Sequence, residues 1–575
     1  MNYSLIEARN EIKNVLKNTL NKLKYKCEIK VEIPPEGMGD FAFPCFQLSA
    51  IAKKSPNDIA KEIANNIDKT QWIDKVETKG AYVNFIINNE KLKYKTLKTI
   101  LKKNKKYGFL KNKNKKVIIE HTSANPNGPL HVGRARNPII GDTLVRIFKT
   151  AGYDVESQFY LDDMGKQVAI LAWGVNNLDA KDVPKSDYNK SDHKTVGFYQ
   201  LASKLKDENI EISNEIGKIV KSSEEGKKET IDMVHKAYFP VLKGIKESLK
   251  KINISVDKYV PESNFVKDKS VEKVVKELKK SKYCGKEEDA FFIDMKPFGI
   301  KGRNTNFFFL RSNGTTLYAT RDVAYHIWKA KNADFLVNVL GEDHKLESKQ
   351  VEIALKLIGE KKLPNAVFYS FVSLPGGKMS TRKGRVVYLD DLIEESINRA
   401  YKEVNKRRGN ELTKEKMNKI SEIIGIGAIR YNLIKVQPEK DIVFKWEEAL
   451  NFEGNSAPFI QYSHARACSI LSKNKEKIKD FDGGILKHDS EEKLIKKISE
   501  LPIVIDNAYK GFKPHLIANF LFDLASQFNQ FYRDCPVIFE NNEKLRKSRL
   551  ALVDATRIAL KNGLDILGIT APEEM

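Results

Sequence analysis

The chain has 575 residues, of which 100 are Lys or Arg and 76 are Asp or Glu, so its formal net charge is +24. Hydrophobic residues make up 41% and charged residues 31%, which is typical of a folded globular protein and excludes a largely disordered chain. At about 150 residues per domain, the length predicts three or four domains. The positive charge favours a polyanionic partner, but a lysine-rich composition gives the same total without one.

The five cysteines are scattered, odd in number and form no CxxC pair, which argues against a disulfide framework and a zinc ribbon. The first residues contain acids and lysines and lack the apolar core of a secretory signal. No apolar run approaches the roughly 18 residues that a membrane span needs. We therefore expect a cytoplasmic protein with no membrane partner.

Residues 1–110 predict an α+β domain. Its expected elements are a helix over 5–23, a strand over 26–33, two short helices between 46 and 66 and a strand over 80–87. Residues 101–116 then contain eight lysines and no acid. The ordinary interpretation is a solvated linker, and the sharper one is a linker that also contacts phosphates.

Residues 111–450 predict a doubly wound, Rossmann-like parallel sheet, because short apolar strands alternate with helices. A polar, lysine- and glutamate-rich helical insertion is expected at about 176–300, and residues 451–575 predict an all-α domain. The expected fold class is therefore multidomain α/β with an α+β N-terminal and an all-α C-terminal domain. The expected elements of the sheet domain are strands at 117–120, 157–160, 335–340 and 366–371, a helix starting near 131 and a helix at 346–358.

The segment from Glu120 to Arg134 joins a predicted strand to a predicted helix, at the edge of a parallel sheet where ligands bind. A helix N-terminus presents free N–H groups and a positive dipole end, which suits a phosphate. His131 adds an imidazole donor, and Gly133 leaves room for a flat base. A histidine and a glycine at this spacing carry little information alone.

A second motif, residues 375–384, places glycines around three cations and two hydroxyls. Because Met379 follows Lys378, the segment is not a Walker A loop. The cations and hydroxyls predict a phosphate-binding loop. Together with the His131 segment, it predicts a clamp for the triphosphate of ATP. Its cations are Lys378, Arg382 and Lys383, and its hydroxyls are Ser380 and Thr381.

The sequences His131-Val-Gly-Arg134 and Lys378-Met-Ser-Thr381 resemble the two signature motifs of class I aminoacyl-tRNA synthetases. The resemblance narrows to arginyl-tRNA synthetases and extends from end to end. It rests on residues 123–137, 160–167, 316–326, 452–466 and 567–575 and on Gly39-Asp40-Phe41. One departure is Arg134, where the family usually has histidine. Either residue donates hydrogen bonds to ribose or phosphate, so we expect activity to survive.

The resemblance implies an arginine–tRNA ligase. This enzyme activates L-arginine with ATP, accompanied by Mg²⁺, and transfers the arginyl group to the 3′-terminal ribose of tRNA(Arg). It also implies that activation requires bound tRNA and that the protein is a monomer. Positioning and charge stabilisation are expected to supply most of the catalysis.

The resemblance also assigns site residues. An arginine substrate calls for carboxylates and amide oxygens, and Tyr318 and Asp322 share one helix face. Asp322 alone would be read as a surface acid pairing Arg321 or a lysine. The expected arginine site is Glu120, Ser123, Asn125, Tyr318, Asp322 and Asp343. The expected catalytic residues are His131, Gly133, Arg134, Lys378 and Ser380. The expected ATP site is Pro129, His131, Gly133, Arg134, His344, Lys378, Met379, Ser380 and Thr381.

A metal site at 342–344 is weakly indicated, because no companion ligand is evident, and we predict none. For tRNA, the expected residues are Asp40, Phe41, Tyr462, His464 and Arg466, although aromatics at helical spacing are more often core. Two alternatives stay open: a cofactor nucleotidylyltransferase, which is typically shorter, and an inactive RNA-binding paralogue.

Overall fold

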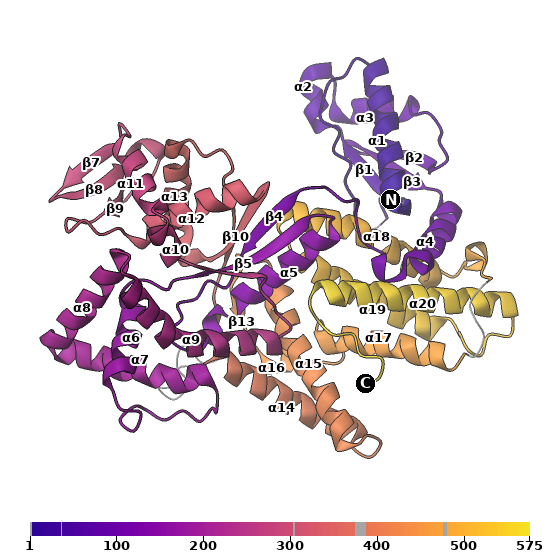
Figure 1. Ribbon diagram of the computed structural model, residues 1–575. Coiled ribbons are helices and arrows are strands. Elements are labelled where there is room, and N and C mark those ends of the chain that lie inside the picture. Colours follow the sequence, from indigo (N-terminus) through magenta and orange to yellow (C-terminus); the bar gives the residue numbers. More distant parts are fainter. Residues whose placement is uncertain (1–2, 36, 303–304, 374–386, 475–479) are drawn as a thin grey trace.

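The computed structural model describes residues 3–575 except 36, 303–304, 374–386 and 475–479. The N-terminal unit is a three-stranded antiparallel sheet, in the order β1-β3-β2, covered by helices (Figure 1). The predicted strand over 26–33 is wrong: only a single bridge, between Glu32 and Ala42, forms there among the described residues. The elements are α1 (Ser4–Lys22), β1 (Phe41–Pro44), α2 (Ser49–Ala52), α3 (Pro56–Asn65), β2 (Ile73–Lys79), β3 (Tyr82–Ile87) and α4 (Asn89–Lys103).

The central sheet has five parallel strands in the order β11-β10-β4-β5-β6. The chain begins with β4 in the middle, adds β5 and β6 on one side, and then returns to add β10 and β11 on the other. The topological switch point therefore lies between β4 and β10, and the predicted doubly wound sheet is confirmed. The strands are β4 (Lys116–Glu120), β5 (Asp154–Leu161), β6 (Lys258–Pro261), β10 (Phe335–Gly341) and β11 (Asn365–Tyr369).

The helices of this sheet domain include α5 (Arg136–Thr150), α12 (Tyr318–Asn332) and α13 (Lys345–Ile358). The predicted helix start near 131 lies just before α5. The α-helix itself begins at Arg136, because a 3₁₀ turn at Val132–Arg134 comes first. The sheet and the C-terminal helices share one continuous apolar core, which explains why β4 and β10 are almost fully buried.

The sequence analysis expected a helical insertion at about 176–300, but the stretch between β5 and β10 also contains strands. β6 belongs to the central sheet, and β7, β8 and β9 form a separate antiparallel sheet. β6 and β7 are short and partly exposed and lack a clear period-two pattern, whereas β8 and β9 are short apolar runs that the sequence analysis missed. The remaining elements are α6 (Lys166–Asn177), α7 (Ser191–Glu208), α8 (Ile210–Glu224), α9 (Lys228–Lys251), α10 (Ser263–Lys267), α11 (Ser270–Lys279), β7 (Cys284–Glu287), β8 (Ala290–Asp294) and β9 (Asn306–Leu310).

The C-terminal part is helical, as predicted, and packs beside the N-terminal unit and the sheet (Figure 1). Phe520, Leu524, Phe528 and Phe531 are buried, so these aromatics and their neighbours form core. No helix in the described part of the chain combines the length and apolar character needed to cross a membrane. The elements are β12 (Val372–Ser373), α14 (Leu389–Arg408), α15 (Lys414–Ile434), β13 (Ile442–Val443), α16 (Trp446–Ala449), α17 (Ala457–Ser472), α18 (Asp489–Gly511), α19 (His515–Asp534) and α20 (Glu543–Ile566).

Candidate active site

A cavity of about 170 Å³ opens at the carboxyl ends of β4 and β10, at the switch point of the sheet. Acids outnumber bases among its lining residues, so the cavity has the charge that a cationic ligand requires. It brings together all six residues expected around arginine: Glu120, Ser123, Asn125, Tyr318, Asp322 and Asp343. Arg134 and His344, from the expected ATP site, line it as well.

The turn after β4 has a strained backbone. Thr122 and Ser123 have φ of 74° and 33°, in the left-handed region that non-glycine residues rarely adopt. Asn137 holds this turn, because its Oδ1 accepts from the Thr122 N–H at 2.7 Å while its Nδ2 donates to the Val339 carbonyl at 3.1 Å. One α5 residue therefore ties the ends of β4 and β10 together at the cavity. Strain of this kind collects at functional sites.

Glu120 is buried and already has a strong partner. Its Oε2 accepts from Lys329 Nζ at 2.6 Å, and its Oε1 accepts from the Ser123 hydroxyl at 3.1 Å. Lys329 is fully buried and also donates to Asn338 Oδ1 at 3.0 Å. The sequence analysis missed Lys329. Its only signal is its position seven residues after Asp322, on the same face of α12.

Asp322 lies one quarter exposed at the cavity, and its carboxylate is 3.1 Å from His326 Nδ1. Burial would raise the pKa of Asp322, but the positive charge and hydrogen bond of His326, with Lys329 and His344, lower it below its ordinary value. The alternative pairing with Arg321 is wrong, because Arg321 is buried and its Nε lies 2.9 Å from Glu262. Asp322 is thus an ionised carboxylate facing the cavity.

Further acids lie at the base of the cavity. Asp162 and Glu262 both line it, and burial raises the pKa of each carboxyl above its ordinary value. Asp162 Oδ1 and Glu262 Oε2 are buried with no hydrogen-bond partner among the described residues. Such atoms are costly unless a ligand satisfies them. The sequence analysis did not select either residue, although Asp162 falls within one of its motifs.

The His131 turn follows the strained turn along the chain. His131 Nδ1 accepts from the Gly133 N–H at 3.0 Å, so in the neutral imidazole the proton lies on Nε2. A Cβ added at Gly133 would lie 3.0 Å from this same Nδ1, a tight contact that would require the imidazole to shift slightly. Arg134 is exposed, and Pro129 is buried beneath the turn. The turn therefore presents one imidazole donor and one guanidinium near the cavity.

Arg136, which the sequence analysis also missed, is fully buried two residues beyond this turn. Burial lowers the pKa of its guanidinium to about 10. Its donors go to main-chain carbonyls, and so the arginine fixes the segment before β13 against the end of β11. These carbonyls belong to Ser370, Leu433, Val436, Gln437, Pro438 and Lys440.

His344 lies at the end of β10, and its Nδ1 is 3.0 Å from Glu347. The hydrogen bond to Glu347 raises the pKa of His344 above its ordinary 6.5, against the opposing effect of burial. The histidine is therefore cationic below this raised pKa and loses its charge as the pH rises through it.

This titration predicts a pH-dependent affinity for ATP. With His344 in the ATP site that the sequence predicts, we expect the KM for ATP to rise by about threefold to tenfold as the pH passes above the raised pKa, because a cation at that site becomes neutral. Steady-state pyrophosphate exchange across the pH range measures this. Glu347→Gln should move the rise to lower pH, and His344→Gln should remove it. A rise that persists unchanged in His344→Gln would assign it to another group.

Lys378, Met379, Ser380 and Thr381, with Arg382 and Lys383, lie outside the described residues. Their predicted roles in ATP binding and catalysis stay predictions. The described metal-like cluster, Asp192, His193 and Asp390, lies elsewhere, in the contact between α7 and α14.

The residues expected to contact tRNA are dispersed. His464 is 1% exposed and its Nδ1 donates to the Pro572 carbonyl at 2.8 Å, while Phe41 is core. Asp40 accepts from the Ile87 N–H at 2.8 Å and pairs with Lys496 at 2.5 Å. These placements do not favour a direct RNA contact for His464 or Phe41.

Tyr462 and Arg466 instead line a groove of about 660 Å³ beside the carboxyl-terminal Met575. The Arg466 guanidinium lies 4.8 Å from the Tyr462 ring centre and 5.2 Å from that of Tyr532, and both rings are partly exposed. Exposed aromatic faces beside guanidinium groups suit an unpaired base.

Comparisons with known proteins agree with this geometry. Residues 96–446 match the model for "tRNA synthetases class I (R), catalytic domain", residues 460–575 the "DALR anticodon binding domain", and residues 8–87 the "Arginyl tRNA synthetase N terminal domain". The chain is 47% identical to the arginine–tRNA ligase of Methanocella arvoryzae, over 92% of each chain. It is 41% identical to that of Methanococcus maripaludis, over 95% of each.

Among solved structures, the arginyl-tRNA synthetase of Thermus thermophilus superposes with a TM-score of 0.85 at 27% identity, over 99% of this chain and 100% of that one. The match covers the N-terminal unit, the parallel sheet and the C-terminal helices together. The chain therefore belongs to the arginyl-tRNA synthetase family, within class I of the aminoacyl-tRNA synthetases.

Proposed function

We propose how this arginine–tRNA ligase divides its reaction among the residues described above. L-Arginine binds in the cavity at the switch point, with its guanidinium among the acids. The observation that carries this assignment is the excess of carboxylates at the cavity, two of them with buried oxygens that no described side chain satisfies. A guanidinium has five donors and keeps its charge at every physiological pH, which matches such a site.

In the first step, a carboxylate oxygen of arginine attacks the α-phosphorus of ATP, the bond to the β-phosphate oxygen breaks, and pyrophosphate leaves. His131 Nε2 and Arg134 donate to the developing charge, and Lys378 with Ser380 assists. His344 contacts the nucleotide, as do Pro129, Gly133, Met379 and Thr381. Mg²⁺ accompanying ATP would be held by the phosphates themselves and would supply charge neutralisation there.

In the second step, the terminal ribose hydroxyl of tRNA(Arg) attacks the arginyl carbonyl carbon, and AMP leaves. Discrimination against lysine or citrulline needs no editing site, because either substrate would leave buried carboxylates unpaired. By resemblance to the family, the protein acts as a cytoplasmic monomer. We also propose domain boundaries at 1–110, 111–450 and 451–575.

Pyrophosphate exchange with arginine, run with and without tRNA(Arg), tests this function. We expect exchange that requires arginine and depends on the tRNA. Exchange with another carboxylate, or with a cofactor precursor in place of arginine, would point to a nucleotidylyltransferase. No exchange under any condition, with tRNA binding intact, would point to an inactive RNA-binding paralogue.

We further propose that the groove lined by Tyr462 and Arg466, with the Tyr532 ring also against the Arg466 guanidinium, binds an unpaired base of the tRNA. We expect Arg466→Ala to weaken tRNA(Arg) binding about tenfold or more, because stacking on an aromatic platform contributes about 1–3 kcal/mol per base. Filter binding at fixed salt measures this, and the KM values for ATP and arginine at saturating tRNA serve as controls. Arg557→Ala provides a matched surface arginine, since its side chain pairs with Asp554. Equal weakening by both variants would contradict a specific base site.

A further inference from the structure

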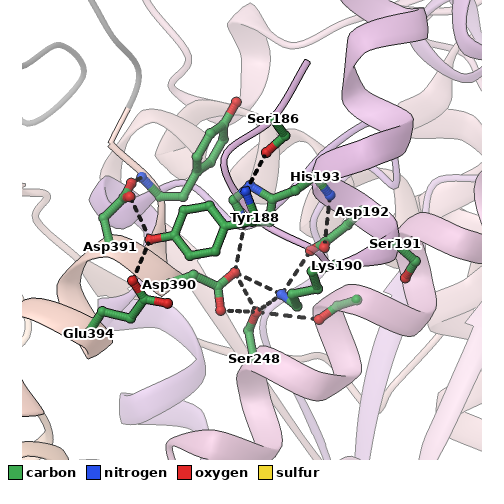
Figure 2. A network of polar contacts seen from close by, with 12 residues as sticks. Ser186, Tyr188, Lys190, Ser191, Asp192, His193, Ser248, Asp390, Asp391 and Glu394 are labelled. Carbon is green, nitrogen blue, oxygen red and sulfur yellow. Dashed lines mark hydrogen bonds and ion pairs between the residues drawn. The ribbon is translucent and has the colours of Figure 1, made fainter. Parts of the chain in front are cut away.

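A buried network of polar side chains joins α7 and α9 to the start of α14 (Figure 2). At its centre, Lys190 Nζ lies 3.0 Å from Asp192 Oδ2 and 2.7 Å from Asp390 Oδ2, and it also contacts the Ser248 hydroxyl. The side chains of Lys190, Asp192 and Asp390 are 9%, 0% and 1% exposed. Charges this deeply buried are retained only where each has its partners.

The network has further bonds on the Asp390 side. His193 Nε2 lies 3.0 Å from Asp390 Oδ2, and the Ser248 hydroxyl donates to Asp390 Oδ1 at 3.0 Å. Burial would raise the pKa of Asp390, but the bonds from His193 and Lys190 lower it to about 2. Gly244 makes the close approach of α7 and α9 possible, because a Cβ there would lie 2.2 Å from Asp192.

A metal ion is the first alternative for such a cluster. Donor atoms of Asp192, His193 and Asp390 lie within 4.8 Å of one another. However, the ammonium group of Lys190 is already within hydrogen-bond distance of both carboxylates. The cationic position is therefore taken by a lysine, and the cluster works as an ionic lock between elements.

Asp390 of this lock directly follows residues 387–389, whose main chain is hydrogen-bonded to the segment around His131. Leu389, which precedes Asp390, donates its N–H to the Leu130 carbonyl at 2.8 Å, and the Val132 N–H donates to the Val387 carbonyl at 3.1 Å. His131 and Tyr388 pair between these two bonds as an isolated bridge. The position of residues 387–389 therefore sets the position of the His131 turn.

A second contact fixes the same helix start. The Tyr188 hydroxyl donates to Asp391 Oδ1 at 2.8 Å, and Asp391 Oδ2 accepts from the Tyr388 N–H at 2.7 Å. In Figure 2 the Tyr188 ring points toward Asp391 and Glu394 on α14. The segment before α7 thus contacts α14 at two adjacent residues, Asp390 and Asp391.

We propose that Lys190 and Asp390 are positioning residues for amino-acid activation, because they lock α14 to α7 and α9 and thereby hold the His131 turn in place for ATP. The inference rests on the proposed role of His131. A displacement of about 1 Å in a catalytic group can cost about 100-fold in rate, so a lock of this kind can matter without touching substrate.

Lys190→Met tests the proposal, with Lys93→Met as the matched control. Lys93 is also a buried lysine, 2% exposed, and donates to the Leu486 carbonyl and Glu492 between α4 and α18. Both variants should lower the melting temperature, because each leaves a carboxylate without its partner. We expect Lys190→Met alone to lower kcat for tRNA-dependent pyrophosphate exchange, by about 10- to 100-fold, and to raise the KM for ATP, with the KM for arginine unchanged.

Two milder variants cover the case in which Lys190→Met does not fold. Ser248→Ala removes one bridging hydroxyl, and Asp390→Asn removes one charge at constant size. Both should change the same ATP parameters, to a smaller extent. If the folded variants of this network match Lys93→Met in kcat and in the KM for ATP, the network only stabilises the fold and the proposal is overturned.

A double-mutant cycle separates this inference from the proposed function. If Lys190 acts through His131, Lys190→Met should cost little more in a His131→Ala background than His131→Ala alone. Full additivity of the two losses would overturn the inference. Normal exchange in His131→Ala would instead overturn the proposed role of His131, and the two failures are therefore distinguishable.

Discussion

His131→Ala should reduce the rate of arginyl-adenylate formation by about 100- to 1,000-fold, which is the usual cost of removing one donor to a developing negative charge. The KM for arginine should change little, since the imidazole does not line the arginine cavity. Single-turnover adenylate formation with saturating tRNA measures the chemical step directly. His131→Gln should recover part of the rate, because an amide N–H can replace Nε2 as a donor.

The His131→Ala variant needs a control for the local structure of the turn. The Gly133 N–H donates to the His131 ring, so His131→Ala also removes one local hydrogen bond. Far-UV circular dichroism and the melting temperature should therefore be compared across the variants. A full rate in a folded His131→Ala protein would contradict the proposed role and would transfer the charge stabilisation to Arg134 or to the segment containing Lys378.

Asp322→Asn should raise the KM for arginine by about 100-fold or more and leave the KM for ATP nearly unchanged. The variant replaces an ionised carboxylate by a neutral amide of the same size, so a charge-assisted pair with guanidinium is lost. Citrulline, the neutral isostere of arginine, gives the sharper measurement. The inhibition constant of citrulline divided by the KM for arginine should fall, because the site no longer distinguishes the charged from the neutral group.

Tyr318→Phe is the matched control on the same face of α12. It keeps the ring and removes the hydroxyl, so any effect reports the hydrogen bond and not the charge. The difference in the KM for arginine between the wild type and Asp322→Asn should persist down to acidic pH. The lowered pKa of Asp322 keeps the wild-type carboxylate ionised until the pH falls below the ordinary titration range of an aspartate. Equal arginine KM values in Asp322→Asn and the wild type would refute the cavity as the arginine site.

Local patterns predicted the central sheet well. β4, β5, β10, β11, α5 and α13 all lie within a few residues of their expected positions, since buried parallel strands read as short apolar runs. The strand expected at 26–33 failed, and β6 and β7 were missed, because they are short and partly exposed. Such strands form through their neighbours more than through their own sequence.

The candidate site divides in the same way. The resemblance to the family assigned Glu120, Tyr318 and Asp322 to the arginine site, and the cavity contains all three. Spacing gave no indication that Lys329, 209 residues after Glu120, would occupy one of its oxygens. It also gave no indication that His464 would turn inward to Pro572. Pairing partners far apart in sequence are selected by packing, to which local periodicity is blind.

The sequence by itself determined the family and the order of the main elements of the central sheet, because these depend on residues close together in the chain. The net charge of +24 could not locate the acidic cavity, since a total says nothing about position. Only the tertiary structure decided which charges are buried together: Lys329 with Glu120, Arg321 with Glu262, and Lys190 with Asp390 across 200 residues. Burial makes the choice of partner matter, because an unpartnered charge away from water is strongly destabilising.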